Sequence, residues 1–530
     1  MFPDRRDFLK QITAGAAGIG LLSALPHDLF AQAGNPRALP RSTPELQGLS
    51  SGGIRALVET VEKNNLGLHS LMVVRHGKVV AEGWWDPYQP DLKHVLFSLS
   101  KSFTSTAVGF AVTEGRLKVA DKVVSFFPED APANPNGHLA AMRIRDLLTM
   151  TSGHDQDTMP ALREEKQGGW VRKFLSLPVV HPPGTFFLYN TGASYLLSAI
   201  VQRVTGQTLL DYLTSRLLQP LGIEGADWET DPQGINTGGY GLRLTTEDIA
   251  KFGQFYLQKG SWNGKRLLPE TWIREATSFQ VPNASSTGKN PESDWHQGYG
   301  YQFWQCRHGA YRGDGAVGQF CVVLPAQDAV VAITSETADM PQILNQVWNH
   351  LLPAMTSAPL PADSHVPSLS RKLASLTLLP AKTMATSPLA ARVAGKSYQL
   401  ADNALKARTV SFGFDGRTGT FTLVDNRGEH RISCGLGHWV KAETGMPVAA
   451  PPIDSGPVQK ATRAKVASCG SWQDENTFVM TWVFFETPHS DTVTCHFSGD
   501  TIRVEFKSSK LGKRPDYRET RPVLEGRWLA

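Results

Sequence analysis

The sequence has few cysteines, a small net charge and no long apolar run, and each shortage excludes a class of protein. Five cysteines in 530 residues are too few for a disulfide-built scaffold, and the odd number leaves at least one unpaired within the chain. Their spacing holds no zinc pattern. A net charge of +4 without a basic stripe argues against nucleic acid as a partner. No segment has the length of a membrane span.

The first 33 residues resemble an export signal. Residues 4–10 contain paired arginines, 12–25 form a short apolar stretch rich in Ala and Gly, and Ala31-Gln32-Ala33 is a small-x-small cleavage site. We therefore expect 1–33 to be a twin-arginine signal peptide. The mature chain would then be periplasmic or secreted from a bacterium.

A serine and a lysine stand three residues apart in 94–105 (HVLFSLSKSFTS). Phe103, Ala107 and Phe110 recur at the spacing of a buried helical stripe, so Ser98 and Lys101 open an apolar helix. A step of three residues is nearly one turn, which lets the lysine amine reach the serine hydroxyl. The positive end of the helix dipole favours an alkoxide and disfavours a protonated lysine. The pair indicates a nucleophile beside its base, suited to acyl transfer.

The same spacing occurs at Ser286 and Lys289, in a turn-forming run with no helix behind it. We expect no catalytic role for that second pair. The first pair, taken alone, also fits a helix start that its serines merely cap. Groups elsewhere in the chain must therefore decide between the two interpretations.

Two such groups are present. Tyr189 stands between turn residues on a loop at 181–192, ahead of a helix expected at 194–205. Chemistry-bearing side chains are common on loops of this kind. The segment 313–318 (GDGAVG) is flexible enough for backbone N–H groups to approach a ligand closely.

The order of the expected elements predicts an α+β fold. A helix at 51–64 and strands at 70–75 and 79–83 come first, a mainly helical region follows from about 118 to 280, and strands return at 299–305, 319–324 and 329–334. This order predicts one antiparallel sheet built from both ends of the domain, with flanking helices and a helical subdomain.

The composition changes beyond residue 355. Residues 353–368 are rich in Pro, Ser and Ala, so we expect a domain over 34–355, a linker over 356–390 and a separate all-β barrel or sandwich over 391–530. Because the linker has few apolar residues to join two cores, a chain ending near Ala354 is expected to fold with a reactive Ser98.

The region 40–355 resembles the serine β-lactamase and penicillin-binding protein superfamily on its class C side, and within it the esterase and 6-aminohexanoate-dimer hydrolase type. The resemblance rests on Ser98-x-x-Lys101, Tyr189 and the glycine-rich 313–318, in that order. It implies a β-lactamase-like fold, an acylated Ser98, Lys101 as a neutral base or proton relay, Tyr189 as a second proton shuttle and no metal or organic cofactor. It further implies an oxyanion hole from the N–H groups of Ser98 and Ala316, and substrate contacts from Thr191, Gly313, Asp314 and Gly315.

Two departures from the family's motifs bear on the substrate. The motif Tyr-x-Asn becomes Tyr189-Asn190-Thr191; aligning Asn190 instead would place Leu188 at the tyrosine position. Gly313-Asp314-Gly315 stands where relatives have Lys-Thr-Gly or His-x-Gly, and His296-Gln297-Gly298 matches the latter motif only before the preceding strand. An acidic group in a partly dry site predicts that neutral or cationic esters and amides are preferred over anionic β-lactams by at least about tenfold in kcat/KM.

These observations predict a serine hydrolase that cleaves an ester or amide bond of a small-molecule or peptide-like substrate through a Ser98 acyl-enzyme. Two alternatives stay open. One is a β-lactamase or D-alanyl-D-alanine peptidase. The other is a non-catalytic protein, either an acylated sensor or a cell-wall binding protein.

Overall fold

The structure is a computed structural model of the chain and describes residues 38–284, 288, 290–361, 366–379, 384, 386–446, 464–513 and 517–529. The chain divides into two units, Met1–Pro36 and Arg37–Ala530, and the described residues all belong to the second. The expected signal peptide and the pair Ser286 and Lys289 lie outside the described residues. None of the helices within the described ranges is both long and apolar enough to cross a membrane.

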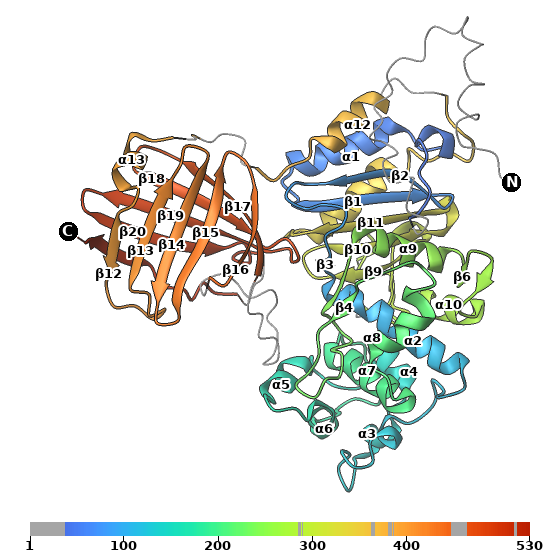
Figure 1. Cartoon of the computed structure of the whole chain (residues 1–530). Helices are drawn as coiled ribbons and strands as arrows, with labels where there is room; N and C mark the ends of the chain where they lie inside the picture. The colour runs from blue at the N-terminus through green and yellow to red at the C-terminus, as the bar shows by residue number, and fades with distance from the viewer. Residues whose placement is uncertain are drawn as a thin grey trace, which may run out of the picture. The chain divides into compact units, whose positions relative to one another are not determined.

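A six-stranded antiparallel sheet organises the first part of the chain, with the strand order β2-β1-β11-β10-β9-β8 (Figure 1). Its strands are β1 (Leu68–Arg75), β2 (Lys78–Trp84), β8 (Trp304–Gln305), β9 (Tyr311–Gly315), β10 (Gln319–Leu324) and β11 (Ala329–Ser335). The register of β1 on β11 runs from Leu68 opposite Ser335 to Arg75 opposite Ala329. The sheet is therefore built from both ends of the region, as the sequence predicts.

Helices cover both faces of this sheet, so β1, β10 and β11 are buried along their whole lengths. One face packs with α1 (Ser51–Lys63), α11 (Met340–Gln346) and the π-helical turn η8 (Val347–Leu351). The other face packs with α9 (Thr246–Leu257), and behind it with a helical region. That region contains α3 (Gly137–Ala141), α4 (Ile144–Leu148), α5 (Met159–Glu164), α6 (Trp170–Ser176), α7 (Thr191–Thr205) and α8 (Leu209–Leu213).

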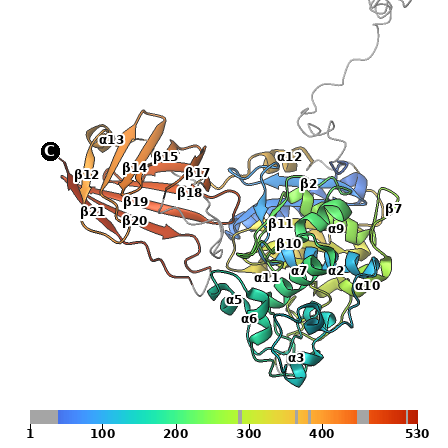
Figure 2. The ribbon, with the colours of Figure 1, turned by 60° about the horizontal axis from the view of Figure 1, so that its bottom comes forward.

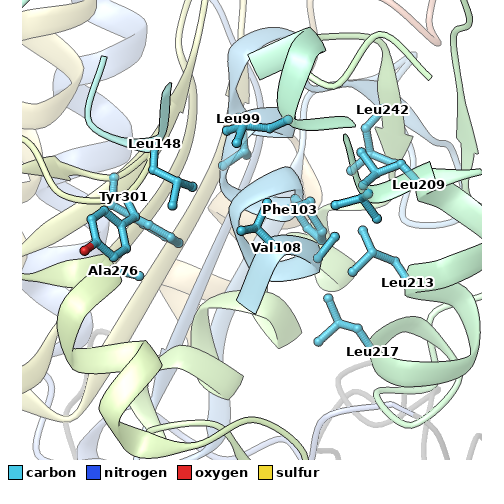
Figure 3. Packing of buried hydrophobic residues seen from close by; sticks show 14 of the residues in the cluster. Leu99, Phe103, Val108, Leu148, Leu209, Leu213, Leu217, Leu242, Ala276 and Tyr301 are labelled. Carbon is cyan, nitrogen blue, oxygen red and sulfur yellow. The ribbon is translucent and has the colours of Figure 1, made fainter. Parts of the chain in front are cut away.

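Helix α2 (Ser100–Thr113) runs through the centre of this core. Every residue from Ser100 to Ala111 is buried, so the helix packs on all sides rather than along the single stripe that its periodicity predicts. Figure 3 shows Phe103 and Val108 of α2 close to Leu209 and Leu213 of α8. Because α2 is packed on all sides, the position of its first residues relative to the sheet is fixed.

The last part of the chain forms a β-barrel (Figures 1 and 2). Its strands are β12 (Ser397–Leu400), β13 (Thr409–Phe414), β14 (Thr418–Asp425), β15 (Gly428–Leu436), β16 (Val440–Thr444), β17 (Ala464–Trp472), β18 (Thr477–Val483), β19 (Ser490–Ser498), β20 (Thr501–Ser508) and β21 (Leu524–Trp528). Parallel pairing of β15 with β17, at Gly435 opposite Cys469, closes a ring of nine strands in the described residues, and β16 adds to β17. Large aromatic side chains such as Trp472 and Trp482 fill the interior.

Two segments differ from the sequence prediction. Within 356–390, the expected linker, the structure contains helix α12 (Val366–Ala374) and the start of α13 (Pro388–Val393). Leu369 of α12 is buried in the core that also contains α1, so part of this segment belongs to the packed fold. Residues 313–315 are the end of strand β9, and the turn comprises only residues 316–318. The domain boundaries themselves stay a prediction.

Candidate active site

Ser98 lies in a single 3₁₀ turn, η3 (Phe97–Leu99), immediately before α2. Its neighbours Phe97 and Leu99 are buried, whereas Ser98 is partly exposed. Phe97 has φ +47°, a left-handed conformation that bulky residues rarely adopt. The phenyl ring packs with Val95 and Val317. Buried neighbours therefore hold a strained turn that presents the serine hydroxyl.

The amine of Lys101 is buried beside this hydroxyl. Its Nζ lies 2.9 Å from Oγ of Ser98, 2.8 Å from the carbonyl oxygen of Gly239 and 3.5 Å from Oγ1 of Thr191. Burial lowers the pKa of Lys101 from 10.5 to about 7, against opposing effects of Asp157 and Asp314. A neutral amine can donate its two N–H groups to Gly239 and Thr191 and keep its lone pair for the serine proton.

The ring of Tyr189 lies next to the same amine, with its centroid 4.8 Å from Nζ of Lys101. It stacks on Trp304 at 5.3 Å and meets Tyr299 edge-on at 6.3 Å. Burial, aided by the Asp314 carboxylate, raises the pKa of Tyr189, and a hydrogen bond with Ser98 offsets part of the rise. The phenol therefore stays protonated and has a proton to share.

The geometry around α7 distinguishes the two possible alignments of Tyr189-Asn190-Thr191. Asn190 is the N-cap of α7, and its Oδ1 accepts hydrogen bonds from the backbone N–H groups of Gly192 and Thr158 and from the Thr158 hydroxyl. Its side chain is used in holding the loop. Tyr189 and Thr191 are the residues that approach Lys101, so the alignment that places Tyr189 first agrees with the geometry.

The turn at residues 316–318 is held close to η3. Oγ of Ser335 donates to the carbonyl oxygens of Val317 and Gly318, both at 2.8 Å, and Nε2 of Gln319 donates to the carbonyl oxygen of Ala316 at 3.1 Å. Among the described residues, the N–H groups of Ala316 and Ser98 donate to no other residue. Both amides are therefore available for a ligand oxygen.

The strand before this turn packs directly on the nucleophile segment. A Cβ on Gly313 would lie 2.3 Å from Leu99 and 2.8 Å from Oγ of Ser102, and one on Gly315 would lie 2.1 Å from the Leu96 carbonyl oxygen. The two glycines thus permit close approach of β9 to η3. Whether they also touch the substrate stays a prediction.

Asp314 pairs with Arg312, whose Nε and Nη2 donate to one of its carboxylate oxygens. The carboxylate is buried, which raises its pKa, while Arg312 opposes the rise. The charge of Asp314 is therefore balanced by Arg312, and whether Asp314 also contacts the substrate stays a prediction. The rival motif at residues 296–298 lies in a loop, where the side chains of His296 and Gln297 bond to residues 290–293.

Sequence reasoning missed two residues of the site. Gly239 accepts a hydrogen bond from Lys101, and a Cβ there would lie 2.6 Å from the Thr191 side chain. Its run, 237–241 (TGGYG), was a usable signal. Asp157 accepts the backbone N–H of Thr191 at 2.8 Å, and no local pattern marks it. No group of three or more His, Cys, Asp or Glu side chains among the described residues could hold a metal ion.

Comparisons with known proteins give the family of the chain. Residues 54–349 match the Beta-lactamase family, so the chain belongs to that family. The 6-aminohexanoate-dimer hydrolase of Paenarthrobacter ureafaciens is 25% identical over 287 residues, 51% of this chain and 73% of that protein. Protein flp of Staphylococcus aureus is 29% identical over 205 residues, 36% of this chain and 41% of that protein.

Solved structures are also similar, among them a penicillin-binding protein homologue from Caulobacter crescentus, with 16% identity, a TM-score of 0.46, and coverage of 57% of this chain and 97% of that one. The family match and the curated relatives establish the class of the protein. It is a β-lactamase-related serine hydrolase.

Proposed function

We propose that the protein hydrolyses an ester or amide bond through an acyl-enzyme on Ser98. The observation that carries the proposal is the buried Lys101 amine, 2.9 Å from the serine hydroxyl and with a pKa lowered to about 7. An amine that is half neutral near pH 7 can accept the serine proton. The name of the 6-aminohexanoate-dimer hydrolase supports an amide as one substrate class.

The steps follow from the positions of the side chains. Lys101 removes the proton of Ser98, whose oxygen attacks the substrate carbonyl carbon. The oxygen that gains charge is stabilised by the N–H groups of Ser98 and Ala316. The proton passes from Lys101 through the Tyr189 hydroxyl to the leaving amine or alkoxide. A water molecule then attacks the acyl carbon, its proton passes through Lys101 to the oxygen of Ser98 as the ester bond breaks, and the acid product leaves.

The cellular location is part of the proposal. The paired arginines at residues 5 and 6 and the short apolar stretch after them support twin-arginine export, so the substrate would be met in the periplasm or outside the cell. A reporter that is active only after export tests the proposed export. Residues 1–40 are fused to it in two forms, the wild type and the double variant Arg5→Lys with Arg6→Lys. Loss of reporter activity in the double variant is expected, and equal activity of the two fusions would contradict export.

Burst kinetics with a nitrophenyl ester test the reaction. A burst followed by steady turnover, together with fluorophosphonate labelling that Ser98→Ala abolishes and Ser286→Ala does not, is the expected result. A burst without turnover would indicate an acylated sensor instead. A side-by-side panel of esters, linear amides, a cephalosporin and a D-alanyl-D-alanine peptide separates the hydrolase from a β-lactamase or peptidase.

A further inference from the structure

The loop between β18 and β19 of the barrel contacts the segment that leads to Ser98. The carbonyl oxygen of Glu486 accepts the backbone N–H of Val95 at 3.0 Å. The imidazole of His489 lies 6.0 Å from the ring of Phe97, centroid to centroid. The carbonyl oxygen of Thr487 accepts the Tyr88 hydroxyl at 2.8 Å. We call residues 484–489 the docking loop. With His489, this loop contacts Val95 and Phe97, which precede Ser98 by three residues and by one.

The same loop also binds the element that holds the turn at 316–318. Glu336 is buried, and its Oε1 lies 2.8 Å from Nδ1 of His489 and 2.7 Å from Oγ of Ser509, both from the barrel. Lys513 reaches Oε2 at 3.1 Å. A carboxylate held by three barrel side chains leaves its own backbone little freedom to move.

Glu336 stands between two residues that hold this turn. The hydroxyl of Ser335, before it, donates to the carbonyl oxygens of Val317 and Gly318, and the N–H of Thr337, after it, donates to Val317 at 3.0 Å. The backbone N–H of Glu336 itself donates to Gly67 at 2.8 Å. A shift of Glu336 would therefore also move the turn at residues 316–318, because the residues on both sides of Glu336 bond to it.

The docking loop therefore contacts both chain segments that supply the proposed oxyanion hole. The segment with Ser98 includes Phe97 at φ +47°, and the segment with Ala316 includes Val317 at φ +57°. Such conformations persist only where the surroundings hold them. Phe97 and Val317 pack on each other. His489 lies against the ring of Phe97 and also binds Glu336, whose neighbours Ser335 and Thr337 hold Val317 in place.

We propose that the docking loop positions the two oxyanion-hole amides, with His489 as the positioning residue, so that the barrel is required for acylation without touching the substrate. This inference rests on the proposed function, because the oxyanion hole is assigned there. A misplaced hydrogen-bond donor loses most of its stabilisation of the transition state. The effect of losing His489 is therefore expected in the rate of acylation rather than in ligand binding.

The test uses the full-length chain and a fluorophosphonate probe, with the maximal labelling rate and the probe's dissociation constant measured separately. His489→Ala is expected to lower the labelling rate at Ser98 at least tenfold and to change the dissociation constant less than twofold. His489→Asn, whose side-chain N–H replaces Nδ1–H, is expected to recover most of the rate. His430→Ala is the matched control, because His430 also pairs with a buried carboxylate of the barrel, Asp425, at 3.0 Å, and it should label at the wild-type rate.

Hydrogen exchange supplies a readout independent of catalysis. In a folded His489→Ala protein, the hydrogen-bonded amides of Val95, Leu96 and Gly318 should exchange faster, while those of α7 stay unchanged. If this variant does not fold, Ser509→Ala takes its place. This substitution removes one donor to Glu336 and keeps His489. We expect its labelling rate to fall at least threefold. The inference is overturned if a folded His489→Ala protein labels within twofold of the wild-type rate. If His489→Ala does not fold, the same result in Ser509→Ala overturns it. Lack of labelling in wild type contradicts the proposed function instead.

Discussion

Arg312 donates two hydrogen bonds to the same carboxylate oxygen of Asp314, from Nε at 3.0 Å and from Nη2 at 2.8 Å. The guanidinium also donates to the carbonyl oxygen of Asp294 and to Sγ of Cys306, and it is fully buried. Arg312 therefore neutralises Asp314, and four of its five N–H donors are used within the protein. Repulsion by Asp314 therefore no longer argues against anionic β-lactams, whereas the glycine at position 313, where relatives have lysine or histidine, still does.

Asp314→Asn is therefore expected to affect stability more than specificity. Removing one partner of a buried ion pair leaves the other charge uncompensated, at a cost of roughly 3–5 kcal/mol in the free energy of unfolding. The kcat/KM ratio between a neutral nitrophenyl ester and a cephalosporin should change less than about threefold. Urea unfolding and paired kinetics measure both. A stable variant with a strongly shifted ratio would restore Asp314 as a substrate-facing charge.

The double variant Arg312→Met with Asp314→Leu tests the ion pair itself. Because apolar residues of similar volume can replace a buried ion pair at little cost, the double variant should be more stable than Asp314→Asn. Equal or lower stability of the double variant would show that the partners of Arg312 outside the pair dominate its energetics.

The pH dependence of kcat/KM should follow Lys101. Only the neutral amine can accept the serine proton, and the pKa of Lys101 in the folded protein is about 7. We expect kcat/KM for a neutral ester to fall as the pH falls through about 7, tenfold for each pH unit well below it. Lys101→Met should lose about 10²–10⁴ in rate and this pH dependence together. Lys251→Met, at another buried lysine, should keep the wild-type profile.

Lys101 should also lower the stability of the folded protein, and the size of this effect should depend on pH. The pKa of Lys101 is about 7 in the folded protein, against an ordinary value of 10.5. The unfolded chain therefore binds more protons between these two values, and stability rises with pH across this window. The cost of Lys101 is complete below pH 7 and amounts to at most about 5 kcal/mol. Lys101→Met should therefore be more stable than wild type near pH 6, by a margin that shrinks toward pH 10. A margin that is constant with pH would contradict the lowered pKa.

Local sequence pattern was enough to predict Ser98 and Lys101 as neighbours, because a step of three residues at a helix start is nearly one turn. The family resemblance, and not the local pattern, placed Tyr189 beside them. The nucleophile turn itself was not predicted, since the spacing placed Ser98 on the helix and the structure places it in η3. Asp157 and His489 reach the site or its supports only through tertiary contacts. Periodicity predicted strands within β13, β14, β15, β18, β19 and β20, such as 501–506. It missed β12, β16 and β21, which have four or five residues, and β17, whose nine residues are mostly buried without alternation.

Gly313→Ala tests the close packing of β9 on the nucleophile turn. The new methyl group would lie 2.3 Å from Cδ1 of Leu99 and 2.8 Å from Oγ of Ser102, so these buried side chains, or η3 and β9 with them, must shift by about an ångström. We expect the fluorophosphonate labelling rate of Ser98 to fall at least tenfold in a protein that still folds. Gly413→Ala, in a barrel strand where the nearest atom would be 3.8 Å away, is the matched control. Near-normal labelling of Gly313→Ala would show that the strand position is not critical.

Truncation tests what α12 contributes, against the sequence-based expectation for a chain ending near Ala354. Leu369 and Leu376 are buried in the core that also contains α1, and the backbone of Leu376 accepts the N–H of Asp86 at 3.1 Å. A chain ending at Ala354 loses both leucines, at a cost of roughly 3–6 kcal/mol. A chain ending at Leu379 keeps them.

Both truncated chains lack the barrel, so their difference in Tm measures the segment from 355 to 379 alone. We expect the chain ending at Leu379 to melt several degrees higher, because one kcal/mol shifts Tm by about 2–4 °C in a domain of roughly this size. Equal Tm values would support the expected linker. Because both chains lack the docking loop, Ser98 should label more slowly in each than in the full-length protein, and full labelling in the longer one would contradict the positioning role of the barrel.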